Sequence, residues 1–288
     1  MIKAWIEAMR LRTLPVSIAG VVCASSYAML DGSFKFLPAL LCFVFAVLAQ
    51  ISSNFANEYY DFKAGLDRVG RDGPRRGVTE GDITPQAMKR ATFIVLALAC
   101  AVGCSLIYWS SPWLIAVGVA IAVGVLAYST GPYPLSHHGL GEVAVIFFFG
   151  LIPVNFTYYI MSSHWSAEVF LGSLAMGLMI ANVLIVNNYR DLEDDRAVGK
   201  HTLAVMFGRK AMATLYLLNG IVAVALLSPL WLNIDLLMLI PQAVYLAIQI
   251  VLFINLRRRS GSALNPLLGM TALNILLYAV IFTLISAI

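Results

Sequence analysis

The sequence of 288 residues is poor in charge: Asp, Glu, Lys and Arg make up 12% of it, whereas apolar residues make up 60%. Soluble domains carry about 25% charged and about 45–50% apolar residues, so this composition excludes a soluble globular domain and a disordered chain. Cysteine is also scarce, with four residues that all lie in apolar runs and form no Cys-x-x-Cys motif. This excludes a disulfide-stapled module, and we interpret these cysteines as packing residues.

The apolar residues lie in long continuous runs, without the alternation of a transmembrane β-barrel strand. A helix of about 20 apolar residues crosses the hydrocarbon layer, and backbone polar groups in lipid must be satisfied within the chain. The sequence therefore predicts an all-α polytopic membrane protein, a single membrane-embedded domain over 1–288 with nine transmembrane helices. The predicted spans are 14–30, 36–57, 91–109, 113–130, 143–162, 168–188, 212–233, 235–256 and 264–288.

Basic residues are distributed unevenly between the connections. Every Lys and Arg except Lys35 falls in connections on one side of the predicted bundle. Positive residues mark the cytoplasmic side, so we expect a cytoplasmic N-terminus, an outer C-terminus and an odd number of spans. Two cytoplasmic connections, about 58–90 and 189–211, are long, and long ordered loops are more often functional than merely connecting.

A repeated motif begins the two long loops. Asn57-Glu58-Tyr59-Tyr60-Asp61 closes the second predicted span, and Asn187-Asn188-Tyr189-Arg190-Asp191 closes the sixth. Asn, Tyr and Asp recur at the same offsets, on two spans that are four helices apart and point the same way. We interpret the chain as a pseudo-repeat of four-helix units with an added ninth helix. Parallel repeats place two equivalent helix ends around one shared site.

Acidic and amide side chains in these motifs have the spacing of one helix face. Asn187, Asp191 and Asp195 are four residues apart, as are Asn57 and Asp61, and residues at this spacing lie side by side on a helix. Two carboxylate clusters that face each other would repel unless divalent cations lie between them. Sparse oxygen ligands suit Mg²⁺, which keeps waters and takes further ligands from substrate phosphates.

Ionisable side chains are missing from the middle of every predicted span. Pumps and proton-coupled carriers normally place such groups deep in the bilayer, so their absence argues against transport. Basic side chains accompany the acids in the two long loops, and beneath them the interior is apolar. Together these features favour a substrate with a diphosphate head and a long hydrocarbon tail.

These residues resemble the UbiA-type intramembrane aromatic prenyltransferases. The first motif of that family, Asn-Asp-x-x-Asp with a further Asp, corresponds to 57–61 with Asp67, and Glu58 stands where an Asp is commoner. Its second motif, Asp-x-x-x-Asp, corresponds to Asp191 and Asp195. Further stretches resemble the branch that acts on 1,4-dihydroxy-2-naphthoate: 11–15, 73–77, 131–135, 139–142 and 199–203.

The resemblance implies a reaction. An all-trans polyprenyl diphosphate would alkylate 1,4-dihydroxy-2-naphthoate at its carboxylated carbon, with loss of CO₂ and diphosphate, to give a demethylmenaquinol. Another acceptor, such as 4-hydroxybenzoate, and a non-enzymatic transporter remain as alternatives. The implied partners are a polyprenyl diphosphate, a small aromatic acid and the bilayer of the inner cell membrane, with the active site facing the cytoplasm and no role for nucleic acid.

Residue types and positions divide the expected site into four groups. The expected Mg²⁺ ligands are Asn57, Asp61, Asp67, Asn187, Asp191 and Asp195, with Glu58 as a further candidate. The expected diphosphate contacts are Lys200, Arg76, Arg75, Lys63 and Arg190. Tyr128 is expected to shield the allylic cation with its π face. The acceptor contacts are expected among Arg12, His137 and His138.

Overall fold

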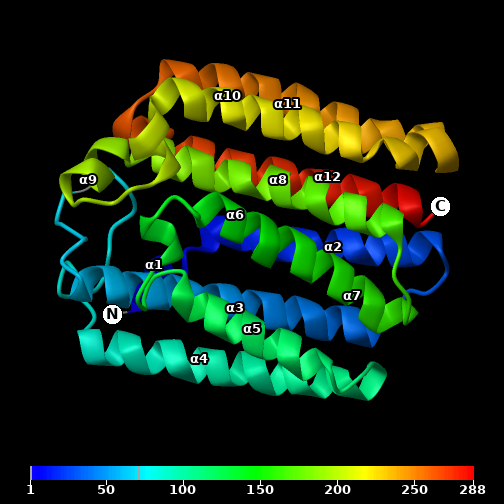
Figure 1. Cartoon of the computed structure of the whole chain (residues 1–288), viewed down its shortest axis with the longest axis horizontal. Coiled ribbons are helices and arrows are strands. Elements are labelled where there is room, and N and C mark those ends of the chain that lie inside the picture. The colour runs from blue at the N-terminus through cyan, green and yellow to red at the C-terminus, as the bar shows by residue number, and fades with distance from the viewer. Residues whose placement is uncertain (1, 71) are drawn as a thin grey trace.

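The computed structural model describes residues 2–70 and 72–288, and this part of the chain is helical and contains no strand. The long helices run side by side along one axis (Figure 1). The α-helices are α1 (Ile2–Met9), α2 (Leu14–Leu30), α3 (Phe36–Lys63), α4 (Pro85–Ser105), α5 (Leu114–Ala127), α6 (Gly141–Val145), α7 (Ile152–Ser162), α8 (Ala167–Arg190), α9 (Leu192–Ala197), α10 (Leu203–Leu226), α11 (Leu239–Arg258) and α12 (Asn265–Ser286).

Eight helical segments within the described ranges are long and apolar enough to cross a membrane. They lie where eight of the nine spans are predicted. The remaining prediction, 113–130, coincides with the shorter apolar helix α5 of 14 residues. At about 1.5 Å per residue, such a helix extends for about 21 Å, less than the hydrocarbon thickness of about 30 Å.

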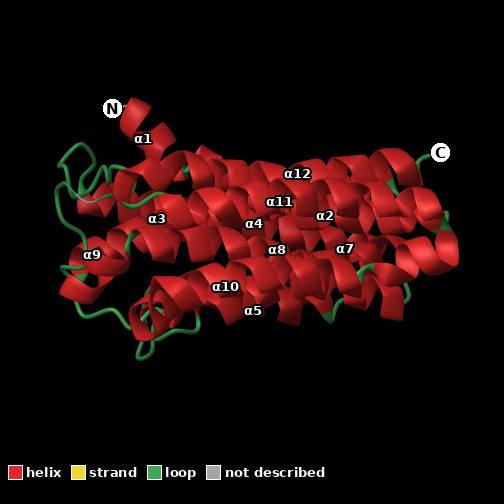
Figure 2. Cartoon of the chain, turned by 90° about the horizontal axis from the view of Figure 1, so that it is seen from above, coloured by secondary structure: helices red, strands yellow, loops and turns green. Residues whose placement is uncertain are grey.

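The N-terminus forms a helix that the span prediction does not include. α1 buries Ala4 and Ala8, and its Trp5 ring makes an edge contact with Phe55 of α3 at 5.5 Å between centroids. Arg10 follows in the left-handed conformation, with φ of 53°. This turn redirects the chain into α2 and leaves α1 at the same end of the bundle as α9 (Figure 2).

The predicted fifth span is helical but irregular. It consists of α6, a π-helical stretch (Ile146–Leu151) and α7. Gly150 in the π-helical stretch lies so close to α8 that a Cβ atom on it would be 2.4 Å from the Cα of Gly177. Glycine at both positions allows the two backbones to touch, which is a common device in membrane helix packing.

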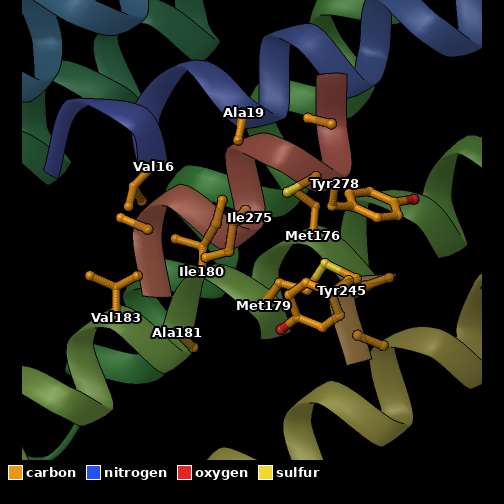
Figure 3. Packing of buried hydrophobic residues seen from close by; sticks show 14 of the residues in the cluster. Val16, Ala19, Met176, Met179, Ile180, Ala181, Val183, Tyr245, Ile275 and Tyr278 are labelled. Carbon is orange, nitrogen blue, oxygen red and sulfur yellow. The ribbon is translucent and has the colours of Figure 1, made fainter. Parts of the chain in front are cut away.

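The main core lies between α2, α8, α11 and α12. In Figure 3, Val16 from α2, Ile180 from α8 and Ile275 from α12 point toward one another. Amides inside the bundle are paired between helices: Asn219 Nδ2 donates to Asn182 Oδ1 at 3.1 Å, and Asn182 Nδ2 donates to the Tyr216 carbonyl at 3.0 Å. These bonds satisfy polar groups that lipid could not.

Both long connections lie at one end of the bundle, which we call the loop end. Figure 1 shows α9, the cyan connection between α3 and α4, and the N-terminus there, with the C-terminus at the opposite end. The helices α3 and α8, which carry the two repeated motifs, both end at the loop end. The fold thus brings together residues that are about 130 positions apart.

Candidate active site

One ammonium group joins the two acidic motifs. Lys200 Nζ lies 3.1 Å from Asp61 Oδ2 and 4.0 Å from Asp195 Oδ1. Asp61 belongs to the last turn of α3, whereas Asp195 belongs to α9 after the end of α8. The two carboxylates therefore lie close enough for a single cation to contact both.

The first motif is organised around the side-chain amide of Asn57. Its Nδ2 donates to Asp61 Oδ2 at 3.3 Å and to Ser129 Oγ at 3.1 Å. Its Oδ1 accepts from Arg10 Nη2 at 2.8 Å and from Arg76 Nη2 at 3.0 Å. The four-residue spacing on α3 thus places the amide and carboxylate together, while two guanidinium groups approach from other segments.

Arg76 is a buried cation in the loop after α3, with 5% of its side chain exposed. Its Nη2 lies 3.8 Å from Asp61 Oδ2, and its Nε lies 3.6 Å from Asp67 Oδ2. Its Nη1 is buried and has no hydrogen-bond partner within 2–70 and 72–288. An unmet charged donor of this kind favours a bound anion, since leaving it unpaired is costly.

The second motif is organised around Arg190, the last residue of α8. Its Nε and Nη2 donate to Asp191 Oδ1 and Oδ2 at 2.7 and 2.8 Å. Nη2 also donates to Asn187 Oδ1 at 2.8 Å, and Nη1 donates to Asn265 Oδ1 of α12 at 2.9 Å. These bonds fix the orientation of the Asp191 carboxylate, so Arg190 holds this end of the site in place.

The helix is interrupted between α8 and α9, yet the acidic stripe, which is the row of Asn187, Asp191 and Asp195, continues across the interruption. Asp191 has a ψ of 7° and ends the regular helix. The Asp195 amide still donates to the Asp191 carbonyl at 2.8 Å, and the Lys200 amide donates to the Asp195 carbonyl at 2.9 Å. The four-residue relation between the two aspartates is therefore kept, and the turn after Gly199 returns Lys200 to them.

Two cavities meet beneath these groups. A polar cavity of about 170 Å³ is lined by both motifs and by Arg10, Arg76 and Lys200. An apolar cavity of about 440 Å³ extends from it between α3, α4, α5 and α7. Both are lined by Gln50, Ser53, Tyr128, Val145 and Phe149. A charged cavity therefore shares a wall with an apolar one, and Tyr128 is part of that wall.

Comparison with known proteins agrees with this architecture. Residues 14–275 match the model of the UbiA prenyltransferase family. The chain belongs to the UbiA prenyltransferase family. It is 35% identical to a 1,4-dihydroxy-2-naphthoate octaprenyltransferase of Escherichia coli (strain K12), over 98% of this chain and 94% of that protein. Because the family consists of prenyltransferases, the chain is an enzyme, and the transporter alternative is excluded.

Solved UbiA structures share the fold. The structure of a UbiA homolog from Archaeoglobus fulgidus matches 99% of this chain and 100% of that one, with a TM-score of 0.71 at 13% identity. A structure of a UbiA homolog from the same organism bound to DMAPP and Mg²⁺ has a TM-score of 0.66 at 15% identity, over 96% of this chain and 99% of that one. The all-α polytopic membrane fold predicted from the sequence is thereby confirmed.

In this UbiA enzyme, two residues expected at the metal or the diphosphate have other contacts. Glu58 is fully buried, but its Oε1 accepts from the Val78 amide at 3.0 Å, and it does not line the polar cavity. Arg75 is exposed and pairs with Asp82 and, at 3.9 Å, with Glu7. The geometry gives Glu58 the role of holding the loop after α3, and it gives Arg75 a surface role.

Of the other residues expected to contact the substrates, three lie away from the two motifs and one reaches them. Lys63 and Arg12 are exposed and line neither cavity. His138 stacks on Tyr133 at 3.9 Å between centroids, and its Nδ1 is 2.9 Å from the Pro134 carbonyl. His137, by contrast, reaches the site, with Nε2 at 3.2 Å from Asp61 Oδ1.

Several polar residues that line the polar cavity were not singled out from the sequence as site residues, among them Arg10, Glu142 and Asn188. Arg10 lies only two positions before Arg12, but the left-handed turn directs it to Asn57. Glu142 and Asn188 line the polar cavity and bond to each other at 2.9 Å. The available signal was that Glu142 is an acidic residue at the start of an apolar span, where an unpaired carboxylate would be costly.

Proposed function

We propose that this UbiA enzyme transfers a polyprenyl group from an all-trans polyprenyl diphosphate to 1,4-dihydroxy-2-naphthoate, with release of CO₂ and diphosphate. The product is a demethylmenaquinol. The 35% identical E. coli relative carries this acceptor in its name, and it aligns over nearly the full length of both chains. The acceptor assignment rests on that relationship and on the sequence stretches that resemble the same branch.

The observation that carries the proposal is that a polar and an apolar cavity lie side by side and share part of their lining. The polar cavity has the charge and size for a diphosphate, and the apolar cavity beside it suits the isoprenoid tail. A diphosphate in the first chamber would place the reacting allylic carbon near Tyr128, where both chambers meet. Water would quench an allylic cation, so an apolar boundary at this point protects the reaction.

The oxygen donors of the two motifs suit Mg²⁺. No group of three or more His, Cys, Asp or Glu side chains in the described part of the chain forms a complete metal site. Mg²⁺ does not require one, because it uses one or two carboxylates, waters and substrate phosphates. The residues that would hold it are Asn57, Asp61, Asn187, Asp191 and Asp195, which line the polar cavity. Asp67 does not line the cavity but lies beside Arg76, which does, and remains a further candidate. Bound there, the ion would offset charge that develops on the leaving diphosphate.

The chain's own cations complete the leaving-group site. Arg76 has an unmet buried donor, Lys200 lies between the two motifs, and Arg10 lines the same cavity. We assign these three to the diphosphate oxygens. Preorganised charges of this kind stabilise the negative charge as the allylic C–O bond breaks. The face of Tyr128 stabilises the positive charge left on the prenyl fragment.

We also propose that α5 is a ninth membrane crossing. It runs back along the bundle between α4 and α6, and it leaves the two termini at opposite ends (Figure 1). Basic residues concentrate at the loop end, which by the positive-inside rule faces the cytoplasm. The active site then opens to the cytoplasmic face of the inner cell membrane.

Turnover by the purified protein tests the proposal. We expect Mg²⁺-dependent release of diphosphate and formation of a prenylated naphthoquinol when 1,4-dihydroxy-2-naphthoate and an all-trans polyprenyl diphosphate are supplied. Parallel reactions with 4-hydroxybenzoate identify the acceptor. A clear preference for 4-hydroxybenzoate would refute the naphthoate assignment but leave the prenyltransferase site intact.

A further inference from the structure

A buried carboxyl group lines the polar cavity but belongs to neither of the two acidic motifs. Glu142 is the second residue of α6, is 5% exposed and lines the polar cavity. Its Oε1 accepts from Asn188 Nδ2 at 2.9 Å. Its Oε2 is buried and lacks a hydrogen-bond partner among the residues that the structure describes. Glutamate is rarely buried without a partner. Glu58 Oε2 also lacks a partner in the described part of the chain, but only Glu142 lines the polar cavity, where a ligand can supply one.

Glu142 bonds to a face of α8 other than the one that carries the second motif. Asn188 follows Asn187 on α8, so its side chain leaves the helix on a different face from the acidic stripe. On the other side, the Tyr128 hydroxyl would lie 3.7 Å from a Cβ atom on Gly141, the residue before Glu142. Tyr128, Val145 and Phe149 line both cavities. Glu142 therefore lines the polar cavity on the side where Tyr128 and Val145 also line the apolar one.

We propose that Glu142 is a catalytic residue that takes the proton from a ring hydroxyl of the aromatic acceptor, and that Asn188 is the positioning residue that aims it. The inference rests on the proposed function, since it requires a hydroxylated acceptor. It does not depend on which hydroxylated acceptor is used.

With 1,4-dihydroxy-2-naphthoate as the acceptor, proton transfer, bond formation and loss of CO₂ are linked through one ring hydroxyl. The Glu142 carboxylate takes the hydroxyl proton next to the carboxylated carbon, and the oxygen electrons move into the ring. That ring carbon forms a bond to the allylic carbon as the C–O bond to diphosphate breaks, and diphosphate leaves with the electron pair. The product of this step is a β-keto carboxylate. It loses CO₂, and the resulting enolate oxygen regains the proton from Glu142.

A purely structural role for Glu142 would not require a carboxyl group. A glutamine could accept the same bond from Asn188 and tie α6 to α8 equally well. A buried carboxyl group is more costly to desolvate than an amide, and its second oxygen gains no compensating bond. A general base, by contrast, needs such an oxygen within reach of the proton that it removes.

The substitution Glu142→Gln tests the inference because it keeps the shape and the bond from Asn188 but cannot take a proton. We expect kcat for prenyl transfer to fall by about 10²–10⁴, the usual contribution of a general base. The KM for polyprenyl diphosphate and the melting temperature in detergent should stay at wild-type values. The matched control is Glu168→Gln, an exposed position at the start of α8, which should leave kcat unchanged.

Two further variants keep the test decisive. Glu142→Asp retains a carboxyl group one methylene shorter, so its kcat should lie between those of the wild type and Glu142→Gln. Asn188→Ala should lower kcat without changing the KM for polyprenyl diphosphate. If Glu142→Gln does not fold, Glu142→Asp decides: wild-type kcat in that variant would overturn the proposal.

Other outcomes also overturn it. Wild-type kcat in Glu142→Gln would exclude a proton-transfer role, and an equal loss of polyprenyl diphosphate binding would indicate a structural role. The measurement uses whichever phenolic acceptor the wild-type enzyme prefers, so a wrong acceptor assignment is detected separately. Absence of transfer to every phenolic acceptor by the wild-type enzyme would refute both proposals, whereas the preceding outcomes refute only this one.

Discussion

Replacement of Lys200 by methionine should have opposite effects on turnover and on the metal requirement. The ammonium group lies between the two acidic motifs, 3.1 Å from Asp61 and 4.0 Å from Asp195. Lys200→Met keeps most of the aliphatic stem and removes the charge. The leaving diphosphate then loses a preorganised cation, while the carboxylates lose a group that competes with Mg²⁺ for them.

The magnitudes follow from the geometry. Loss of one preorganised charge contact should lower kcat by about 10²–10³. Two charges 4 Å apart interact by about 4 kcal/mol at an effective dielectric constant of about 20. Lys200 is 13% exposed, and His137 and Arg76 also face Asp61, so only part of this attraction is released to a metal ion. We estimate that about 1.4 kcal/mol of attraction becomes available to the metal ion. This energy corresponds to a half-saturating Mg²⁺ concentration that is about tenfold lower.

The assay is diphosphate release at saturating polyprenyl diphosphate and acceptor over a series of Mg²⁺ concentrations. Lys63→Met is the matched control, because Lys63 is an exposed lysine at the end of α3 that lines neither cavity. It should leave both quantities unchanged. Unchanged kcat in Lys200→Met would refute the diphosphate role, and a raised Mg²⁺ requirement would refute the competition between ammonium and metal.

Four further variants test other parts of the site and the helix packing beside it. Asp61→Ala and Asp191→Ala should each lower Mg²⁺-dependent transfer by about 10²–10³ while the protein still inserts and elutes as the wild type does; wild-type activity in either would contradict the motif assignment. Gly118→Leu adds a side chain to open space in the apolar cavity. We therefore expect kcat/KM to fall more for long than for short prenyl diphosphates. An equal fall for both would argue against an isoprenoid tail in this cavity. Gly150→Leu cannot fit against Gly177 and should destabilise the protein by about 1–3 kcal/mol, measured as a lower melting temperature in detergent. An unchanged melting temperature would show that the contact between the π-helical stretch and α8 can open freely.

Local spacing predicted the part of the site that lies on helices. Asn57 and Asp61 share one face of α3, and Asn187 and Asp191 share one face of α8, because four residues make about one helical turn. The repeat then predicted that both faces converge, and the contacts of Lys200 with Asp61 and Asp195 agree with that arrangement. The predicted spans matched eight membrane-length helices for the same reason, since long apolar runs have few alternatives in lipid.

The rest of the site depends on how loops return to the helix ends, which spacing cannot predict. Arg75 and Arg76 are neighbours of the same charge, yet one pairs with Asp82 at the surface and the other is buried beside Asp61. The difference arises from Glu58, whose bond to the Val78 amide holds the following loop segment against α3.

Glu58 has a structural role in the loop after α3, through its bond with the Val78 amide. A carboxylate directly after Asn57 points about 100° away from it around the helix, so it cannot share the face that carries Asp61. It faces the loop instead, where buried backbone amides need acceptors. The loop that Glu58 holds carries Arg76 back to Asp61 and Asn57. Glu58 therefore acts on the diphosphate site through Arg76, so a glutamate at this position is compatible with the first motif of the UbiA family.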